Sequence, residues 1–144
     1  MTDARFLPDV NVLIAMTDRG HEGFAAASQW FEQRGQSEWL LCPLTESGFL
    51  RLAAQPDVGG RKLRDAVFLL MELVRLPGYR YCPISEPWLT LTRPFLRRLQ
   101  GYRQVTGAYL LGLAMKESAV LVTLDRRIEL WAAPDFSRNL LTLR

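Results

Sequence analysis

Short apolar runs alternate with segments of helical periodicity along almost the whole chain, and this alternation constrains the fold more than any other feature. The runs that indicate buried strands lie at residues 6–7, 39–42, 79–84, 119–125 and 139–143. Strands that alternate with helices predict right-handed crossovers, a parallel sheet and helices on both faces of the sheet. The sequence therefore predicts an α/β fold, with the last run as an edge strand.

The segments between the strands carry the spacing and end signals of helices. Predicted helices lie within residues 10–16, 21–34, 45–55, 60–78, 85–93 and from 106 onward. The third is expected to begin near Thr45 and to stop before Pro56, and the fifth to be broken by Pro94. Thr106 is predicted to be the N-cap of the last helix, because its hydroxyl can accept a free backbone N–H.

Length and composition describe one globular domain. The chain has 144 residues, of which 49% are hydrophobic, and a formal net charge of +3. This length suits a single domain, residues 1–144, with a real core. The charge is compatible with a polyanionic partner and does not establish one. No apolar run reaches the roughly 18 residues that would cross a bilayer, so a membrane protein is not expected.

Two cysteines, Cys42 and Cys82, each end an apolar run just before a proline. No charged and then apolar leader precedes them, so the sequence gives no secretory context that would favour a disulfide. We expect a cytoplasmic protein in which both thiols stay reduced and act as small core residues.

Three acidic residues fall where predicted strands end. Asp9 follows the first strand, Glu46 the second and Asp125 the fourth. The carboxyl ends of parallel strands gather at one edge of a sheet, so these acids are candidates for one site. Each has a simpler explanation: Asp9 as a helix cap, Glu46 as an acid in a helix first turn, and Asp125 as a turn or ion-pair residue.

Carboxylates brought together repel one another unless a cation neutralises them. Oxygen ligands without histidine or cysteine suit Mg²⁺ or Mn²⁺, which keep several waters when bound. A metal ion of this kind lowers the pKa of a water or stabilises the oxygens of a phosphodiester displacement. The predicted chemistry is therefore metal-assisted hydrolysis.

Gly107 stands in the first turn of the last predicted helix, where an acid would be favoured and glycine adds only backbone entropy. One explanation is that another part of the backbone packs closely against it. The other is that an acid is missing from the predicted site.

Four separated stretches, "LPDVNVLIA", "CPLTESGFLRL", "YRQVTGAYLLGLA" and "LVTLDRRI", resemble in order the motifs of PIN-domain proteins, most closely the VapC-type toxins. The resemblance implies a Rossmann-like sheet and a Mg²⁺-dependent endoribonuclease. It also implies a homodimer, an RNA substrate and a cognate VapB-type antitoxin. The three acids match the family's metal ligands, and Asn11 and Thr123 match the polar residues that support them.

The chain departs from the family pattern at one position. The motif that commonly reads Thr-Asp-Ala-Tyr is here Thr106-Gly107-Ala108-Tyr109, so the acid that serves as a metal ligand is absent. We expect a weak or inactive nuclease. The alternative is a non-catalytic PIN-fold protein that retains antitoxin or RNA binding. A haloacid-dehalogenase-like phosphatase is disfavoured, because Asn11 stands where that family needs a second Asp.

Several basic residues flank the candidate site in sequence and are candidates for binding RNA phosphates. They are Arg97, Arg98, Arg103, Arg126 and Arg127. The alternative is an ordinary solvated basic surface. His21 is the only histidine, and a helix-cap or solvent-facing role is favoured over catalysis because no base and nucleophile pair accompanies it.

Overall fold

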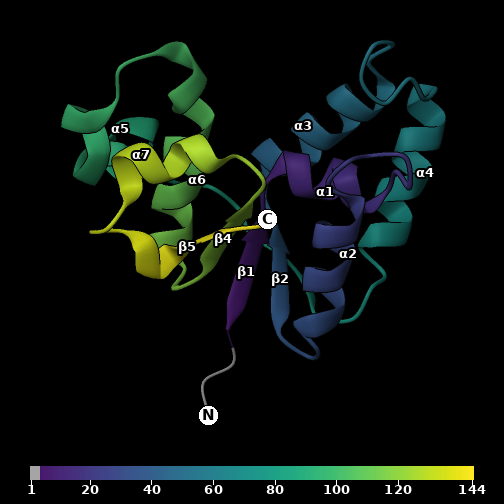
Figure 1. Cartoon of the computed structure of the whole chain (residues 1–144), viewed down its shortest axis with the longest axis horizontal. Helices are drawn as coiled ribbons and strands as arrows, with labels where there is room; N and C mark the ends of the chain where they lie inside the picture. Colours follow the sequence, from purple (N-terminus) through teal and green to yellow (C-terminus); the bar gives the residue numbers. More distant parts are fainter. Residues whose placement is uncertain (1–3) are drawn as a thin grey trace.

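The computed structural model describes residues 4–144, so the first three residues of the predicted domain lie outside it. Its strands form one parallel sheet, as predicted, and their order is β3-β2-β1-β4-β5 (Figure 1). Their bounds are Arg5–Pro8 (β1), Glu38–Leu41 (β2), Tyr79–Tyr81 (β3), Val120–Thr123 (β4) and Leu140–Thr142 (β5). The last strand is an edge strand, which confirms the interpretation of the fifth apolar run.

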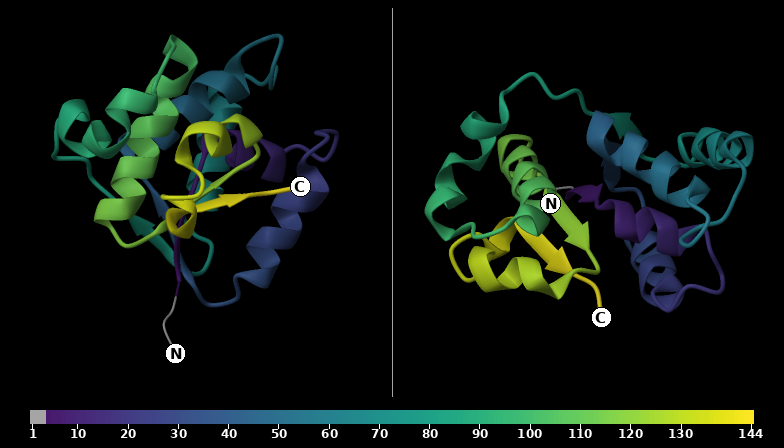
Figure 2. Two further views of the ribbon diagram at one scale, coloured as in Figure 1. Left: turned by 60° about the vertical axis from the view of Figure 1, so that its left-hand side comes forward. Right: turned by 90° about the horizontal axis from the view of Figure 1, so that it is seen from above.

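Helices cover both faces of the sheet (Figures 1 and 2). One group comprises α1 (Val10–Met16), α2 (Phe24–Gln33), α3 (Pro43–Ala54) and α4 (Leu63–Leu73). The other comprises α5 (Trp88–Thr92), α6 (Val105–Lys116) and α7 (Glu129–Ala132), with the 3₁₀ segments η1 (Arg93–Arg98), η2 (Tyr102–Gln104), η3 (Arg126–Ile128) and η4 (Ser137–Asn139). Within residues 4–144, no helix is long and apolar enough to cross a membrane.

Both faces of the central strands are buried. Leu7, Leu40 and Leu121 point into the core under α6. Trp39 and Val122, next along their strands, point to the opposite face under α1 and its neighbours. Successive strand residues face opposite sides of a sheet, so a few apolar residues in a row serve two cores.

Two helix starts differ from the prediction. Helix α6 begins at Val105 rather than Thr106, because the turn η2 leads directly into it, and Gln104 is the N-cap. Thr106 therefore lies inside the first turn and is not a cap. Helix α3 begins at Pro43, with Cys42 as its N-cap, rather than near Thr45. Proline suits this position because a first-turn residue needs no N–H donor.

The chain after α5 also differs from the expected break. Pro94 lies in the first turn of η1, so the chain continues as a 3₁₀ helix instead of leaving the helical conformation. Strand β4 ends at Thr123, two residues before Asp125. The α-helix thus ends at Thr92, before Pro94, while the helical path continues to Arg98.

The two cysteines are buried and free, as predicted for core residues. Burial is the main cause that raises the pKa of the Cys82 thiol to about 11. A thiol with so high a pKa stays protonated at neutral pH and is a poor nucleophile.

Candidate functional site

The site lies where the strand order reverses. From β1 the chain moves to β2 and β3 on one side, and it returns to place β4 on the other side of β1. In an open parallel sheet such a switch point leaves a crevice outside the carboxyl ends of the two central strands. Asp9 follows β1 and Asp125 follows β4, so both reach this crevice.

Asp9 is held in place by both of its carboxylate oxygens. Its Oδ1 accepts the Val10 backbone N–H at 2.8 Å, which makes Asp9 the N-cap of α1. Its Oδ2 accepts the Thr123 hydroxyl at 2.9 Å. Burial raises the pKa of the Asp9 carboxyl, the two hydrogen bonds oppose this shift, and the charge of Asp125 raises the pKa further. The helix-cap explanation is correct, and it coexists with a place in the crevice.

Thr123 joins the two halves of the site. Its buried hydroxyl donates to Asp9 and accepts hydrogen bonds from Asn11 Nδ2 at 3.2 Å and from the Asp125 backbone N–H at 3.1 Å. Asn11 Oδ1 in turn accepts the Leu124 N–H at 3.1 Å. The two polar residues that the family resemblance named as supports thus connect the end of β1 to the end of β4.

Asp125 carries a different set of partners. Its Oδ1 accepts the Arg127 backbone N–H at 3.0 Å and the Arg127 Nε–H at 2.9 Å, and its Oδ2 accepts Arg127 Nη2 at 3.1 Å. The Arg127 guanidinium is the largest cause that lowers the pKa of the Asp125 carboxyl. The two acids of the crevice are therefore shifted in opposite directions.

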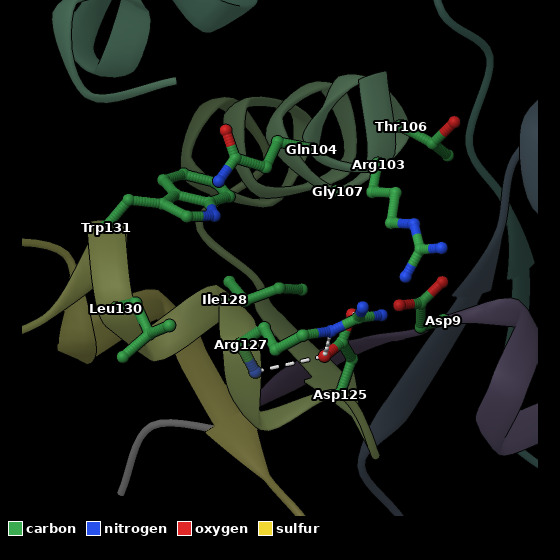
Figure 3. A pocket seen from close by; sticks show the side chains of 10 residues that line it. All are labelled: Asp9, Arg103, Gln104, Thr106, Gly107, Asp125, Arg127, Ile128, Leu130 and Trp131. Atoms are coloured by element: carbon green, nitrogen blue, oxygen red, sulfur yellow. Dashed lines mark hydrogen bonds and ion pairs between the residues drawn. The ribbon is translucent and has the colours of Figure 1, made fainter. Parts of the chain in front are cut away.

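Both acids line one pocket of about 370 Å³ (Figure 3). Its walls come from β1, η2, the first turn of α6 and the η3–α7 segment. The lining residues are Asp9, Arg103, Gln104, Thr106, Gly107, Asp125, Arg127, Ile128, Leu130 and Trp131. The Arg103 guanidinium points toward Asp9 across the pocket, and the Arg127 guanidinium lies on Asp125 (Figure 3).

Gly107 faces this pocket with open space beside it. A Cβ built on Gly107 would meet only the Ile128 side chain, at 3.4 Å and 3.7 Å, which is ordinary van der Waals contact. No backbone approaches it closely, so the explanation of Gly107 as a close-packing glycine is wrong. A Cβ is accommodated at this position, which lines the pocket of the two acids.

Glu46 is not among the residues that line the pocket of the two aspartates. It follows β2, on the far side of β1 from the crevice, and lies partly exposed in the first turn of α3. Within residues 4–144, no three histidine, cysteine or acidic side chains lie close enough together to hold a metal ion. The expected convergence of three acids is thus met by two, and the first-turn explanation of Glu46 matches what the structure shows.

The pocket nevertheless has the donor chemistry of a hard divalent cation. Its candidate ligands are two carboxylates, and the residues of the described chain that line it include no histidine or cysteine. Proteins hold Mg²⁺ through one or two carboxylates while water or substrate oxygens complete its coordination. Asp9 and Asp125 fit this pattern.

The predicted basic residues divide into three groups. Arg103 and Arg127 line the pocket with the two acids. Arg126 lines a neighbouring pocket that shares Asp125 and Arg127 with the first. Arg98 donates to the Trp131 carbonyl and pairs with Asp135, so it fastens η1 to α7, and Arg97 is exposed and lines neither of these pockets.

His21 closes the turn before α2, where Gly23 is the N-cap and no side chain of residues 4–144 caps the helix. Its Nδ1 accepts the Gly23 backbone N–H at 2.9 Å, just before α2 begins. Sequence reasoning missed Ile128 and Gln104 as wall residues of the pocket. A usable signal for Ile128 was its place one turn after Asp125, whereas nothing in the sequence marks the contribution of Gln104.

Comparisons with known proteins agree with the fold. The profile of the PIN domain matches residues 6–133. Ribonuclease VapC38 of Mycobacterium tuberculosis is 36% identical over 121 residues, covering 83% of this chain and 84% of that protein. Ribonuclease VapC44 of the same organism is 32% identical over 136 residues, covering 94% and 96%.

A solved structure shares the architecture at low sequence identity. The crystal structure of Mycobacterium tuberculosis VapC20, a sarcin-ricin loop cleaving toxin, has a TM-score of 0.63 and 13% identity, and the match covers 92% of each chain. This likeness concerns the fold alone, while the sequence matches carry the family assignment. The chain therefore belongs to the PIN-domain family and, within it, to the VapC-type ribonuclease toxins.

Proposed function

We propose that this chain is a divalent-metal-dependent endoribonuclease toxin of a VapBC-type pair whose activity is attenuated or lost because Gly107 replaces an acidic metal ligand. The observation that carries the proposal is the position of Gly107: it lines the same pocket as Asp9 and Asp125 and leaves room for a side chain. A position that tolerates a Cβ and faces two carboxylates is where an acid would act.

Asp9 and Asp125 would hold a Mg²⁺ or Mn²⁺ ion. When bound, such an ion would activate a water and neutralise charge that develops on the phosphodiester. Thr123 holds Asp9 in orientation through a 2.9 Å hydrogen bond, and Asn11 fixes the Thr123 hydroxyl in turn. Glu46 remains a predicted contributor, tested by Glu46→Gln.

Arg103, Arg126 and Arg127 are the basic residues that would contact RNA. The first and third face the acidic pocket, and the second lines the adjoining pocket. Guanidinium groups bind phosphate oxygens and position a nucleic acid without reading its sequence. The arrangement supports a strand that passes over Asp125 between the two pockets.

The test compares the parent chain with Gly107→Asp in Mn²⁺ titrations and in cleavage of a fluorescent RNA. Loss of a supporting group typically costs 10–100-fold in metal affinity or activity, so restoring a direct ligand should raise both by at least about tenfold. Gly107→Asn is the matched control, because it adds similar volume without charge.

Asp9→Asn in the Gly107→Asp background should abolish the restored cleavage, which excludes a contaminating nuclease. Equal affinity and activity in the parent, Gly107→Asp and Gly107→Asn chains would overturn the ligand role of this position.

Partners follow from the family. We propose a VapB-type antitoxin and a homodimeric state, acting in the cytoplasm. The second candidate function is a non-catalytic PIN-fold protein that retains antitoxin or RNA binding, and the same Gly107 observation favours it equally in the parent chain. Antitoxin binding without detectable metal binding or cleavage, in the parent and in Gly107→Asp, would support this second candidate.

A further inference from the structure

The Arg127 side chain occupies the one Asp125 oxygen that is otherwise open. Oδ1 of Asp125 accepts the Arg127 backbone N–H as well as Nε–H, whereas Oδ2 accepts only Nη2 of Arg127, at 3.1 Å, among residues 4–144. Release of the guanidinium would leave the carboxylate oriented by the backbone N–H while freeing Oδ2. The side chain is therefore not needed to aim Asp125.

Arg127 also balances the charge of the pocket. Two carboxylates, Asp9 and Asp125, line it together with two guanidinium groups, those of Arg103 and Arg127 (Figure 3). Like charges so close together are unfavourable without a counter-cation. In this chain, which lacks an acid at position 107, the arginines supply that positive charge from within the protein.

The contact can open at small cost. The Arg127 side chain is 63% exposed, whereas that of Asp125 is 27% exposed. Ion pairs with one highly exposed partner contribute little stability, because water solvates the released charge well. Arg127 can thus leave Asp125 when a stronger cation competes for it.

Arg126 provides an internal comparison. It precedes Arg127 directly, carries the same charge and lines the pocket on the other side of Asp125. Among the ion pairs of residues 4–144, Asp125 is paired with Arg127 and not with Arg126. The two adjacent arginines thus carry the same charge, but only Arg127 contacts the carboxylate and lines both pockets.

We infer that Arg127 is an intramolecular latch on Asp125, which a divalent cation must displace before it can use that carboxylate. This inference rests on the proposed metal-binding role of Asp9 and Asp125 and adds a regulatory contact to it. The apparent affinity for the ion equals the intrinsic affinity multiplied by the fraction of molecules in which Arg127 is released from Asp125.

The test measures Mn²⁺ binding by isothermal titration calorimetry in the full chain and its variants. Arg127→Gln should tighten the apparent Kd by about 1.5- to fivefold, given the usual strength of exposed ion pairs. Arg127→Lys keeps the charge but loses the two-pronged contact, so it should fall between Arg127→Gln and the parent. Arg126→Gln controls for the loss of one positive charge near the site.

A second measurement detects directly whether the Arg127 guanidinium leaves Asp125 when the ion binds. In the parent chain, titration with Mg²⁺ should shift the NMR signal of the Arg127 Nε–H toward that of a solvated arginine, while the Arg126 signal stays unchanged. Equal tightening by Arg127→Gln and Arg126→Gln, no tightening by either, or an unperturbed Arg127 signal at saturating Mg²⁺ would overturn the latch.

The failure of the latch is distinguishable from failure of the proposed function. If Gly107→Asp binds Mn²⁺ and cleaves RNA but Arg127→Gln binds no more tightly than Arg126→Gln, only the latch is wrong. If neither Gly107→Asp nor Arg127→Gln binds Mn²⁺, the metal site itself is wrong, and the latch with it.

Discussion

Helix α6 carries two glycines that look alike in sequence and differ in their surroundings. A Cβ on Gly112 would lie 2.2 Å from the Leu91 carbonyl oxygen, whereas a Cβ on Gly107 would lie no closer than 3.4 Å to a side-chain carbon of Ile128. The first glycine lets α5 pack directly on α6. The second meets no packing requirement, so its presence at the pocket calls for a functional explanation. One helix thus shows that a glycine is informative only once its neighbours are known.

Gly112→Ala tests the close packing of α5 against α6 at the first of these glycines. The added carbon would collide with the backbone of α5, which cannot rotate away as a side chain can. We expect a loss of about 3 kcal/mol in the free energy of unfolding, at the upper end of the usual cost of overpacking. Urea denaturation measures it. A loss below about 0.5 kcal/mol, within the range of ordinary surface substitutions, would mean that α5 and α6 are less tightly packed than the structure shows.

A second matched pair tests the network of the site. Thr123 and Thr142 are partners in the register of β4 and β5. The Thr123 hydroxyl serves Asp9, Asn11 and the Asp125 N–H, whereas the buried Thr142 hydroxyl has no partner within residues 4–144. Thr123→Val should cost about 2 kcal/mol, because it leaves several polar groups unsatisfied.

Thr142→Val is the control for that measurement. Replacing an unpaired buried hydroxyl by a methyl removes a desolvation cost, so this variant should be neutral or slightly stabilising in the same urea titration. Similar losses in the two valine variants would show that the Thr123 hydrogen bonds contribute no more than the packing of any threonine in this sheet.

The fold was predictable because its signals are local. Apolar runs such as 39–42 and 119–125 are buried on both faces, and the turns between elements carry proline or glycine. The alternation of strands and helices then leaves few possible topologies. Helix starts were less predictable, since η2 extends α6 backward to Val105 and Pro43 opens α3.

The site was predictable in part. Asp9, Asn11, Thr123 and Asp125 come from the ends of β1 and β4, and the register of those strands brings them together. Glu46 lies in the first turn of α3, after the neighbouring strand β2, but the crevice opens on the other side of β1. The contact between Arg127 and Asp125 depends on the turn of η3, which no spacing rule specifies.

Gly107→Ala is the counterpart of Gly112→Ala and tests whether alanine is tolerated at the other glycine of α6. If no packing needs Gly107, alanine should stabilise the chain by about 0.5–1 kcal/mol, because it lowers the backbone entropy lost when the helix forms. Thermal denaturation at fixed protein concentration measures the gain. A loss of stability instead would mean that Ile128 cannot accommodate the methyl group, and it would weaken the case for a missing acid.

The smallest expected effect separates the two aspartates of the pocket. Burial raises the pKa of Asp9 above its ordinary value of 3.8, and Arg127 lowers that of Asp125. The Asp9 carboxyl therefore contributes to the free energy of unfolding below pH 3.8, where it is protonated. This contribution is lost as the pH rises through the raised pKa. The Asp125 carboxyl has the opposite pH dependence. It stabilises the fold above pH 3.8, and this stabilisation is lost as the pH falls through the lowered pKa.

Urea titrations between pH 3 and pH 7 measure both terms through Asp9→Asn and Asp125→Asn. With rising pH, Asp9→Asn should gain stability relative to the parent, whereas Asp125→Asn should lose less than about 1 kcal/mol, because Arg127 is largely exposed. Arg127→Gln should remove most of the Asp125 term and leave the Asp9 term in place. If the two Asn variants instead follow the same pH dependence, the arginine does not distinguish the carboxylates, and the pocket behaves as a symmetric pair of acids.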